Sequence, residues 1–290
     1  MNAFDPAVRA ARRLHLSAIL LMLAGLAVPL RAEAARPQPP LRRIPALLPA
    51  PPAPAPGAED GTKEGRAALS AASSAKRSAQ KLEGEERDGA LAAVAAKYAG
   101  IAGTESFTAS ERAEAAFRGG EVLRTLDKAA EADAQFARAT ELGEDTESGR
   151  EFAGRALLER AHMKRRANDA DGALALYAEV SRRFGDQHRT AAHARTWSGK
   201  LQLKAGRLDE ASKQLLGFAE AFPEYAAEAV RNADLLAVAQ VEAGDETAAR
   251  ATIERLRREL EPIMAKGDKL TDDAQAALDN LRVTELLGGY

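Results

Sequence analysis

Apolar residues recur at helical spacing along most of the chain, and one segment shows the pattern clearly. Ala211 is followed by Leu215 four residues later and by Phe218 three residues after that, so the three share one face of a predicted helix. Gly206 marks a turn before this helix, and Gly199 lies twelve residues before Ala211 on the preceding helix. Small residues at 199 and 211 let two antiparallel helices approach closely. The segment predicts a helix–turn–helix unit in which Leu215 and Phe218 fill the space beneath the contact.

The same pattern predicts five copies of this unit. Asn168, Gly206 and Gly244 follow one another at a constant interval, and each occupies a predicted turn. The anchors of the second helices recur at a similar interval, at Ala90, Ala132, Ala173, Ala211 and Ala249. The small positions on the first helices, twelve residues earlier, are Ser78, Gly120, Ala161, Gly199 and Ala237.

This arrangement resembles the tetratricopeptide repeat (TPR), whose signature is a small residue on the first helix, a Gly-containing turn, an Ala on the second helix and a terminal Pro. Pro223 closes the clearest copy here. The resemblance implies an all-α fold, a right-handed superhelical solenoid of antiparallel helix pairs. The copies are longer than the ~34 residues usual for the family. None has the consensus Trp, because Trp197 is out of phase with Gly199 and Ala211.

The segment from Phe222 to Ala229, followed by a helix and then Glu242-Ala243-Gly244-Asp245, resembles the longer repeats of bacterial cell-envelope proteins. Two such groups are the β-barrel assembly lipoprotein and the Tol-Pal system coordinator. Their repeats dock other proteins and do no chemistry, so the resemblance implies a scaffold function. The chain has no Cys for the lipobox of the assembly lipoprotein.

The amino terminus has the layout of a secretory signal peptide over residues 1–34. Arg12 and Arg13 precede an uncharged apolar run from Leu16 to Leu30, and Ala32-Glu33-Ala34 then provides a small-x-small cleavage site. We expect export to the periplasm or the exterior with cleavage after Ala34. An uncleaved membrane anchor is the alternative, although the run is shorter than the ~20 residues that span a bilayer.

The remaining chain divides by composition. Residues 35–60 are rich in Pro and Ala, which predicts a disordered linker that is extended and semi-rigid. A degenerate first repeat is expected over 61–104 and the clearer repeats over 105–262. Thr271, followed by Asp272 and Asp273, predicts the N-cap of a capping helix within 263–290 that covers the last apolar face.

Composition and motifs narrow the possible functions. The 41 basic residues nearly balance the 43 acidic residues, so no global charge favours nucleic acid. The absence of Cys excludes disulfides, thiolate metal sites and Cys nucleophiles. His188 and His193, five apart on a predicted helix, point in different directions and cannot chelate one ion together. No phosphate-binding loop, zinc motif or nucleophile elbow occurs. We therefore expect no enzymatic activity, cofactor or metal.

The candidate binding residues come from the family resemblance. First helices of TPR proteins line a concave groove that binds extended peptides, and seven groove-facing positions are basic or potentially basic here: Arg155, His162, Arg165, Arg166, His193, Lys200 and Lys204. Such a groove suits an acidic segment or a terminal carboxylate. The alternative is a solvated, charge-laced helix face. Trp197 is either a core residue or an aromatic anchor for a partner, and Tyr225 is expected to pack between repeats.

Three functions remain open at this stage. The first is an exported scaffold that binds a protein or peptide in the bacterial cell envelope. The second is an accessory subunit of an envelope assembly that uses its convex face. The third is an enzyme on a helical-repeat scaffold, which requires paired carboxylates that converge from different copies.

Overall fold

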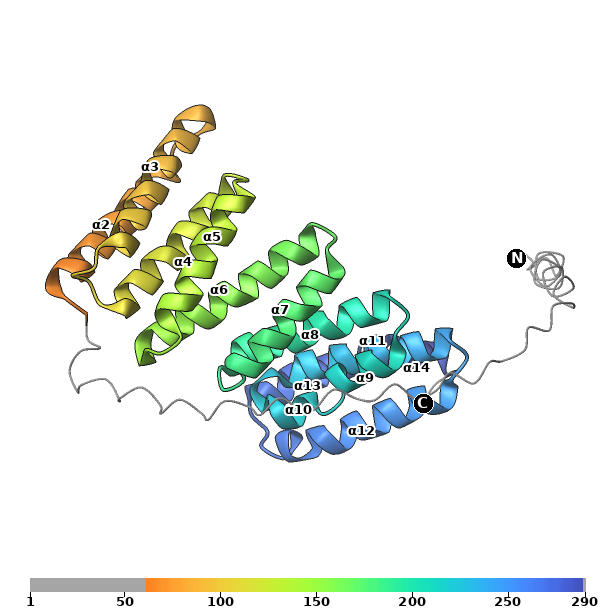
Figure 1. Cartoon of the computed structure of the whole chain (residues 1–290). Coiled ribbons are helices and arrows are strands. Elements are labelled where there is room, and N and C mark those ends of the chain that lie inside the picture. The colour runs from red at the N-terminus through yellow and green to blue at the C-terminus, as the bar shows by residue number, and fades with distance from the viewer. Residues whose placement is uncertain (1–60, 289–290) are drawn as a thin grey trace, which may run out of the picture. The chain divides into compact units, whose positions relative to one another are not determined.

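The computed structural model describes residues 61–288, and these residues form helices and connecting turns without a β-strand. The predicted signal peptide and linker lie outside the described residues. Figure 1 shows the helices packed as consecutive antiparallel pairs. The first three pairs are α2 (Lys63–Ala79) with α3 (Gly84–Gly103), α4 (Ala109–Thr125) with α5 (Ala129–Gly143), and α6 (Glu147–Arg166) with α7 (Ala170–Arg183).

The chain continues with α8 (His188–Lys204), α9 (Leu208–Leu215), α10 (Phe218–Ala221) and a 3₁₀ turn, η1 (Pro223–Tyr225). A further long pair follows, α11 (Ala226–Glu242) with α12 (Glu246–Met264), and then two short helices, α13 (Lys269–Leu278) and α14 (Arg282–Leu286). The first helices of neighbouring pairs are also in contact: α4 packs against α6, and α6 packs against α8. The all-α prediction is confirmed, and the packing of consecutive helices is compatible with a helical repeat.

The small positions make the close helix contacts that the sequence predicts. A Cβ on Gly199 would lie 2.3 Å from a methyl carbon of Leu215, and one on Gly120 would lie 2.7 Å from the Phe136 ring. In each case the small residue lies on the first helix of a pair and the large one on the second. Larger side chains at 199 and 120 are therefore excluded unless the helices separate.

The turns between paired helices share one backbone conformation. Asn168, Gly206 and Gly244 have φ of 60°, 71° and 85°, as the predicted turn positions require. Asp127 takes the same place between α4 and α5 with φ of 57°, although the sequence pattern did not single it out. A left-handed residue ends one helix and lets the next begin at once. Each of these connections contains three residues.

The first pair departs from the predicted register by one residue. Ser78 is exposed and Ala90 is only half-buried, whereas Ala79 and Leu91 are buried. The connection between α2 and α3 contains four residues rather than three. The buried positions therefore lie one residue later on both helices, and the anchors predicted at Ser78 and Ala90 are wrong.

The second helix of the clearest copy is interrupted. Leu216 is extended and Gly217 has φ of 68°, so α9 ends at Leu215 and Phe218 begins a separate helix. Arg195 donates to the carbonyls of Gln214 and Leu216 at 3.0 and 2.9 Å, which satisfies the end of α9. Phe218 is buried as predicted, but it packs with α11 and α12 instead of continuing the stripe of Leu215.

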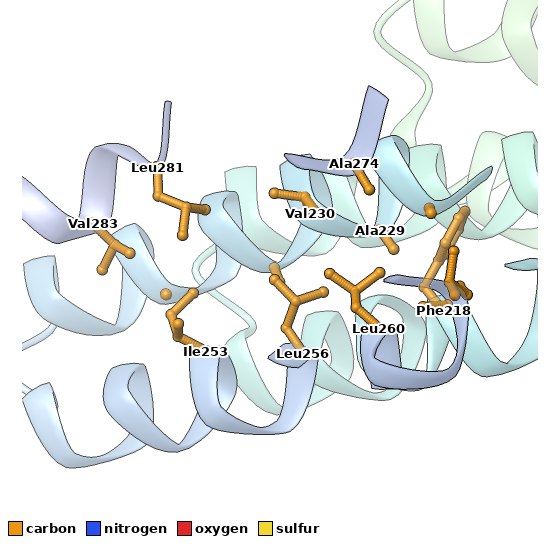
Figure 2. Close-up of a cluster of buried hydrophobic side chains, with 14 of the residues drawn as sticks. Phe218, Ala229, Val230, Ile253, Leu256, Leu260, Ala274, Leu281 and Val283 are labelled. Carbon is orange, nitrogen blue, oxygen red and sulfur yellow. The ribbon is translucent and has the colours of Figure 1, made fainter. Parts of the chain in front are cut away.

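Two short helices take the place of the single capping helix. Asp268 accepts hydrogen bonds from the N–H groups of Leu270 and Thr271, so the N-cap of α13 is Asp268 and the prediction of Thr271 is wrong. Figure 2 shows Val230 of α11 in one apolar cluster with Leu256 of α12 and with Leu281, which precedes α14. The two short helices thus cover the apolar face of α11, as a terminal element of a repeat array must.

Candidate functional site

A cavity of about 360 Å³ opens between α4, α6 and α8, which are the first helices of three successive pairs. Its apolar part consists of Phe117 of α4 and Leu158 of α6, both largely buried. Phe117 packs against the rings of Phe136 and Phe152 at centroid distances of 5.8 and 5.9 Å. The aromatic cluster beneath the cavity therefore fixes its apolar wall.

Arg155, one of the predicted site residues, lines this cavity. Its guanidinium lies 4.5 Å from the centroid of the Phe117 ring, within the range of a cation–π contact. It also pairs with Glu151, one turn earlier on α6, at 3.4 Å. The ring and the carboxylate hold the Arg155 side chain over the apolar wall while nearly half of it stays exposed to solvent.

His162 lies deeper in the same cavity and shares a hydrogen bond with the Tyr177 hydroxyl, 2.6 Å from its Nδ1. Burial lowers the pKa of His162 to about 4, and the nearby Arg165 and Arg166 add to this effect. Burial also raises the pKa of Tyr177 to about 12. At neutral pH the pair is therefore an uncharged imidazole and an intact phenol.

Arg165 and Lys200 pack against Trp197 rather than into the cavity. The Arg165 guanidinium lies 3.8 Å from the centroid of the Trp197 rings, and the Lys200 ammonium lies 5.1 Å from it. His162 meets the same indole edge-on at 6.0 Å. Trp197 is half-buried against the core of α6 and α7, so it serves as a platform for cations on α6 and α8.

The remaining predicted residues differ in their partners. Arg166 lies 3.8 Å from Glu159, and Lys200 lies 3.7 Å from Glu228 on α11. Lys204 is exposed and forms no ion pair with any residue between 61 and 288. The structure thus brings Arg155, His162 and His193 into one cavity and leaves the other four predicted residues outside its lining.

His193 and Arg189 of α8 form the opposite wall. Burial and the positive charge of Arg189 lower the pKa of His193, while Glu228 opposes that shift. Arg189 is exposed and has no ion-pair partner in the described part of the chain. His188, at the first position of α8, turns toward Glu224 at 2.8 Å and meets the Phe222 ring edge-on.

Sequence reasoning missed the acidic part of the lining and one cation. Glu121, Glu151 and Glu159 line the cavity beside the basic residues. Arg155 and His193 are separated by the same interval as successive repeat turns, so they hold equivalent positions on α6 and α8. Glu151 and Arg189 are separated by that interval as well. Applying that interval to each residue of α6 could have found Arg189. Glu121 and Glu159 pair with cations of other helices, so the local sequence gives no sign of these pairs.

Within residues 61–288, no cluster of three or more His, Asp or Glu side chains is placed to hold a metal ion. None of the described helices has the length and apolar character needed to cross a bilayer. A scan against protein-family models gives no match, and no curated protein matches the chain.

Proposed function

We propose that the chain is a non-enzymatic scaffold of TPR-like repeats that binds a protein or peptide in the cavity between α4, α6 and α8. The observation that carries the proposal is that the residues lining this one cavity come from three successive first helices. A repeat array presents equivalent positions of neighbouring repeats side by side, which suits an extended ligand that crosses several helices.

The chemistry of the cavity supports a peptide as its ligand. Phe117 and Leu158 offer an apolar wall, while Arg155 and His193 face it from two helices. An extended peptide needs both features, because its side chains bury apolar area and its charged groups fix its position. The solvent-accessible charges around the apolar wall match this requirement.

The same proposal includes the export of the protein, the role of its Pro-rich segment and the superhelical arrangement of its repeats. The apolar run and the small-x-small site within residues 1–34 support export into the bacterial cell envelope. The Pro-rich segment 35–60 would then space the repeats from their point of attachment. The period and the turn residues support a right-handed superhelical solenoid of the TPR type.

A second surface supports the alternative of an accessory subunit that binds through its second helices. A cavity of about 420 Å³ between α3, α5 and the end of α4 is lined mainly by alanines, among them Ala92, Ala96 and Ala99. Small side chains allow a partner helix to approach closely. Binding there would leave the cavity of Arg155 unused.

Capture of partners from the native envelope fraction distinguishes the two surfaces. The full chain is compared with an Arg155→Glu, His193→Glu double variant and with a Lys213→Glu control, since Lys213 is an exposed residue of α9. We expect a partner that the full chain and the control retain and the double variant loses, with unchanged helicity. A partner that all three chains retain equally contradicts the proposal and favours the second helices.

A further inference from the structure

The first turn of α8 is left without a cap. Gln187 precedes the helix, but its amide nitrogen donates to the carbonyl of Arg150 at 2.7 Å and its side chain makes no capping bond. The first turn contains no acidic residue. The N–H groups of His188, Arg189 and Thr190 therefore have neither an intrahelical acceptor nor a capping oxygen. The positive end of the helix dipole lies at this turn.

Thr190 is a second, independent feature of the same turn. The residue is only 4% exposed and lines the cavity, and its hydroxyl makes no hydrogen bond with any other residue of the described chain. Its hydroxyl oxygen is not fully enclosed by protein atoms, so it is free to donate to a group that enters the cavity. A ligand in the cavity would provide the missing acceptor.

The charges around the cavity leave one cation without a partner. Each carboxylate of the lining has a cation nearby: Glu121 pairs with Lys76 at 3.6 Å, Glu151 with Arg155 at 3.4 Å, and Glu159 with Arg124 at 3.7 Å. Arg189, in the first turn of α8, has no such partner among residues 61–288. The unpaired positive charge of Arg189 therefore lies in the same helical turn as the free N–H groups and Thr190.

We propose that the first turn of α8 binds a carboxylate of the peptide that occupies the cavity. The hydroxyl of Thr190 and the free N–H groups donate hydrogen bonds to the carboxylate oxygens, and Arg189 provides the opposite charge. His193, one turn further along α8, lies beside the same ligand. This inference rests on the proposed function, and it adds the group that is recognised and the residues that recognise it.

The carboxylate can come from a chain terminus or from an acidic side chain, and small probes separate these sources. Amide resonances of the isotopically labelled full chain are followed while acetyl-tetraalanine with a free carboxylate is added. Parallel titrations use the same peptide as its terminal amide, acetyl-Ala-Glu-Ala amide, and inorganic phosphate. We expect saturable shifts of the Arg189 and Thr190 amides with at least one carboxylate peptide and none with acetyl-tetraalanine amide.

Variants test the named groups. Thr190→Val keeps the shape of the side chain and should weaken carboxylate binding about three- to tenfold, whereas Thr190→Ser should restore it. Arg189→Gln should weaken binding about tenfold. The exposed Lys213→Gln serves as the control and should bind like the unaltered chain.

Three results would overturn the assignment: equal shifts with the acid and the amide of tetraalanine, saturable shifts with phosphate alone, or full affinity in Thr190→Val. A wrong carboxylate assignment can be distinguished from a wrong proposed function. If no carboxylate peptide binds but the Arg155→Glu, His193→Glu variant still loses a partner that the full chain captures, the cavity is a binding site and only the carboxylate assignment is wrong.

Discussion

The Glu111 carboxylate accepts a hydrogen bond from the backbone N–H of Thr62 at 2.7 Å, across 49 residues of sequence. Glu111 is 5% exposed and also accepts from the N–H of Thr108 at 2.9 Å, which completes the capping box of α4. Thr62 in turn caps α2 through the N–H of Gly65. One carboxylate therefore joins the starts of two first helices.

Replacing Glu111 by Ala should lower the free energy of unfolding by about 2 to 3 kcal/mol, because two backbone donors lose their acceptor. Urea unfolding measures this change, and hydrogen exchange should show α2 opening first. Glu114→Ala, which removes only an i,i+4 pair with Arg118, is the matched control and should cost about 0.5 kcal/mol or less. Equal losses in the two variants would contradict the role given to Glu111.

Gly199→Ala tests the contact between α8 and α9. The added methyl would meet Leu215, so we expect a loss of about 1 to 3 kcal/mol in stability. Gly89 lies within α3 and has open space where its Cβ would be, so Gly89→Ala should stabilise the chain by about 0.5 to 1 kcal/mol. Thermal melting of both variants measures these changes, and a Gly199→Ala variant that is as stable as the unaltered chain or more stable would show that the contact is not close.

Asn168 tests the turn between α6 and α7. Its φ of 60° costs an ordinary side chain about 1 kcal/mol or more, so Asn168→Ala should destabilise by that amount. Asn168→Gly should leave the stability unchanged or raise it slightly, because glycine adopts this conformation freely. Chemical denaturation compares the two, and equal stabilities would contradict the left-handed turn.

The pH dependence of stability tests the surroundings of His162. The pKa of this residue falls to about 4 in the folded chain, mainly through burial, so the unfolded chain holds the proton more tightly. The stabilisation is complete above the unfolded value of about 6.5 and is lost as the pH falls toward 4. Between pH 7.5 and 5 the loss should be about 1 to 2 kcal/mol. His162→Gln should remove this part of the dependence, and an unchanged profile would contradict it.

Arg165 and Lys204 should respond differently to charge reversal. Arg165→Glu removes the cation from the face of Trp197 and should lower stability by about 1 to 2 kcal/mol, with a change in Trp fluorescence. Lys204→Glu lies on an exposed position and should change stability by less than about 0.5 kcal/mol. If both variants melt like the unaltered chain, the stack on Trp197 contributes nothing measurable.

Local signals in the sequence predicted the helix pairs, because each small residue and each left-handed turn acts within a few residues of its own position. Asn168, Gly206 and Gly244 were found in this way. The shift from Ser78 and Ala90 to Ala79 and Leu91 was missed because both pairs have the same spacing, so the interval used to find the copies cannot distinguish them. The end of α9 was missed because the N–H of Gly217 is bound by Glu259, 42 residues away.

The candidate cavity between α4, α6 and α8 was predictable only in part. The repeat placed Arg155 and His193 on equivalent positions of two first helices, and the structure brings both to one cavity. Which cations remain unpaired depends on neighbours from other helices, such as Lys76 beside Glu121. The sequence therefore indicated the face of the helices but not the residues on it that are free to bind a ligand.

Site-specific cross-linking in cells that produce the chain tests the central claim most directly. A photoreactive residue is placed in the full chain either at Glu151, whose side chain is 71% exposed at the cavity, or at Ala178, an exposed residue of the second helix α7. We predict a discrete cross-linked partner at 151 and none at 178. Cross-links at 178 alone, or the same products at both positions, would contradict binding in the cavity between α4, α6 and α8.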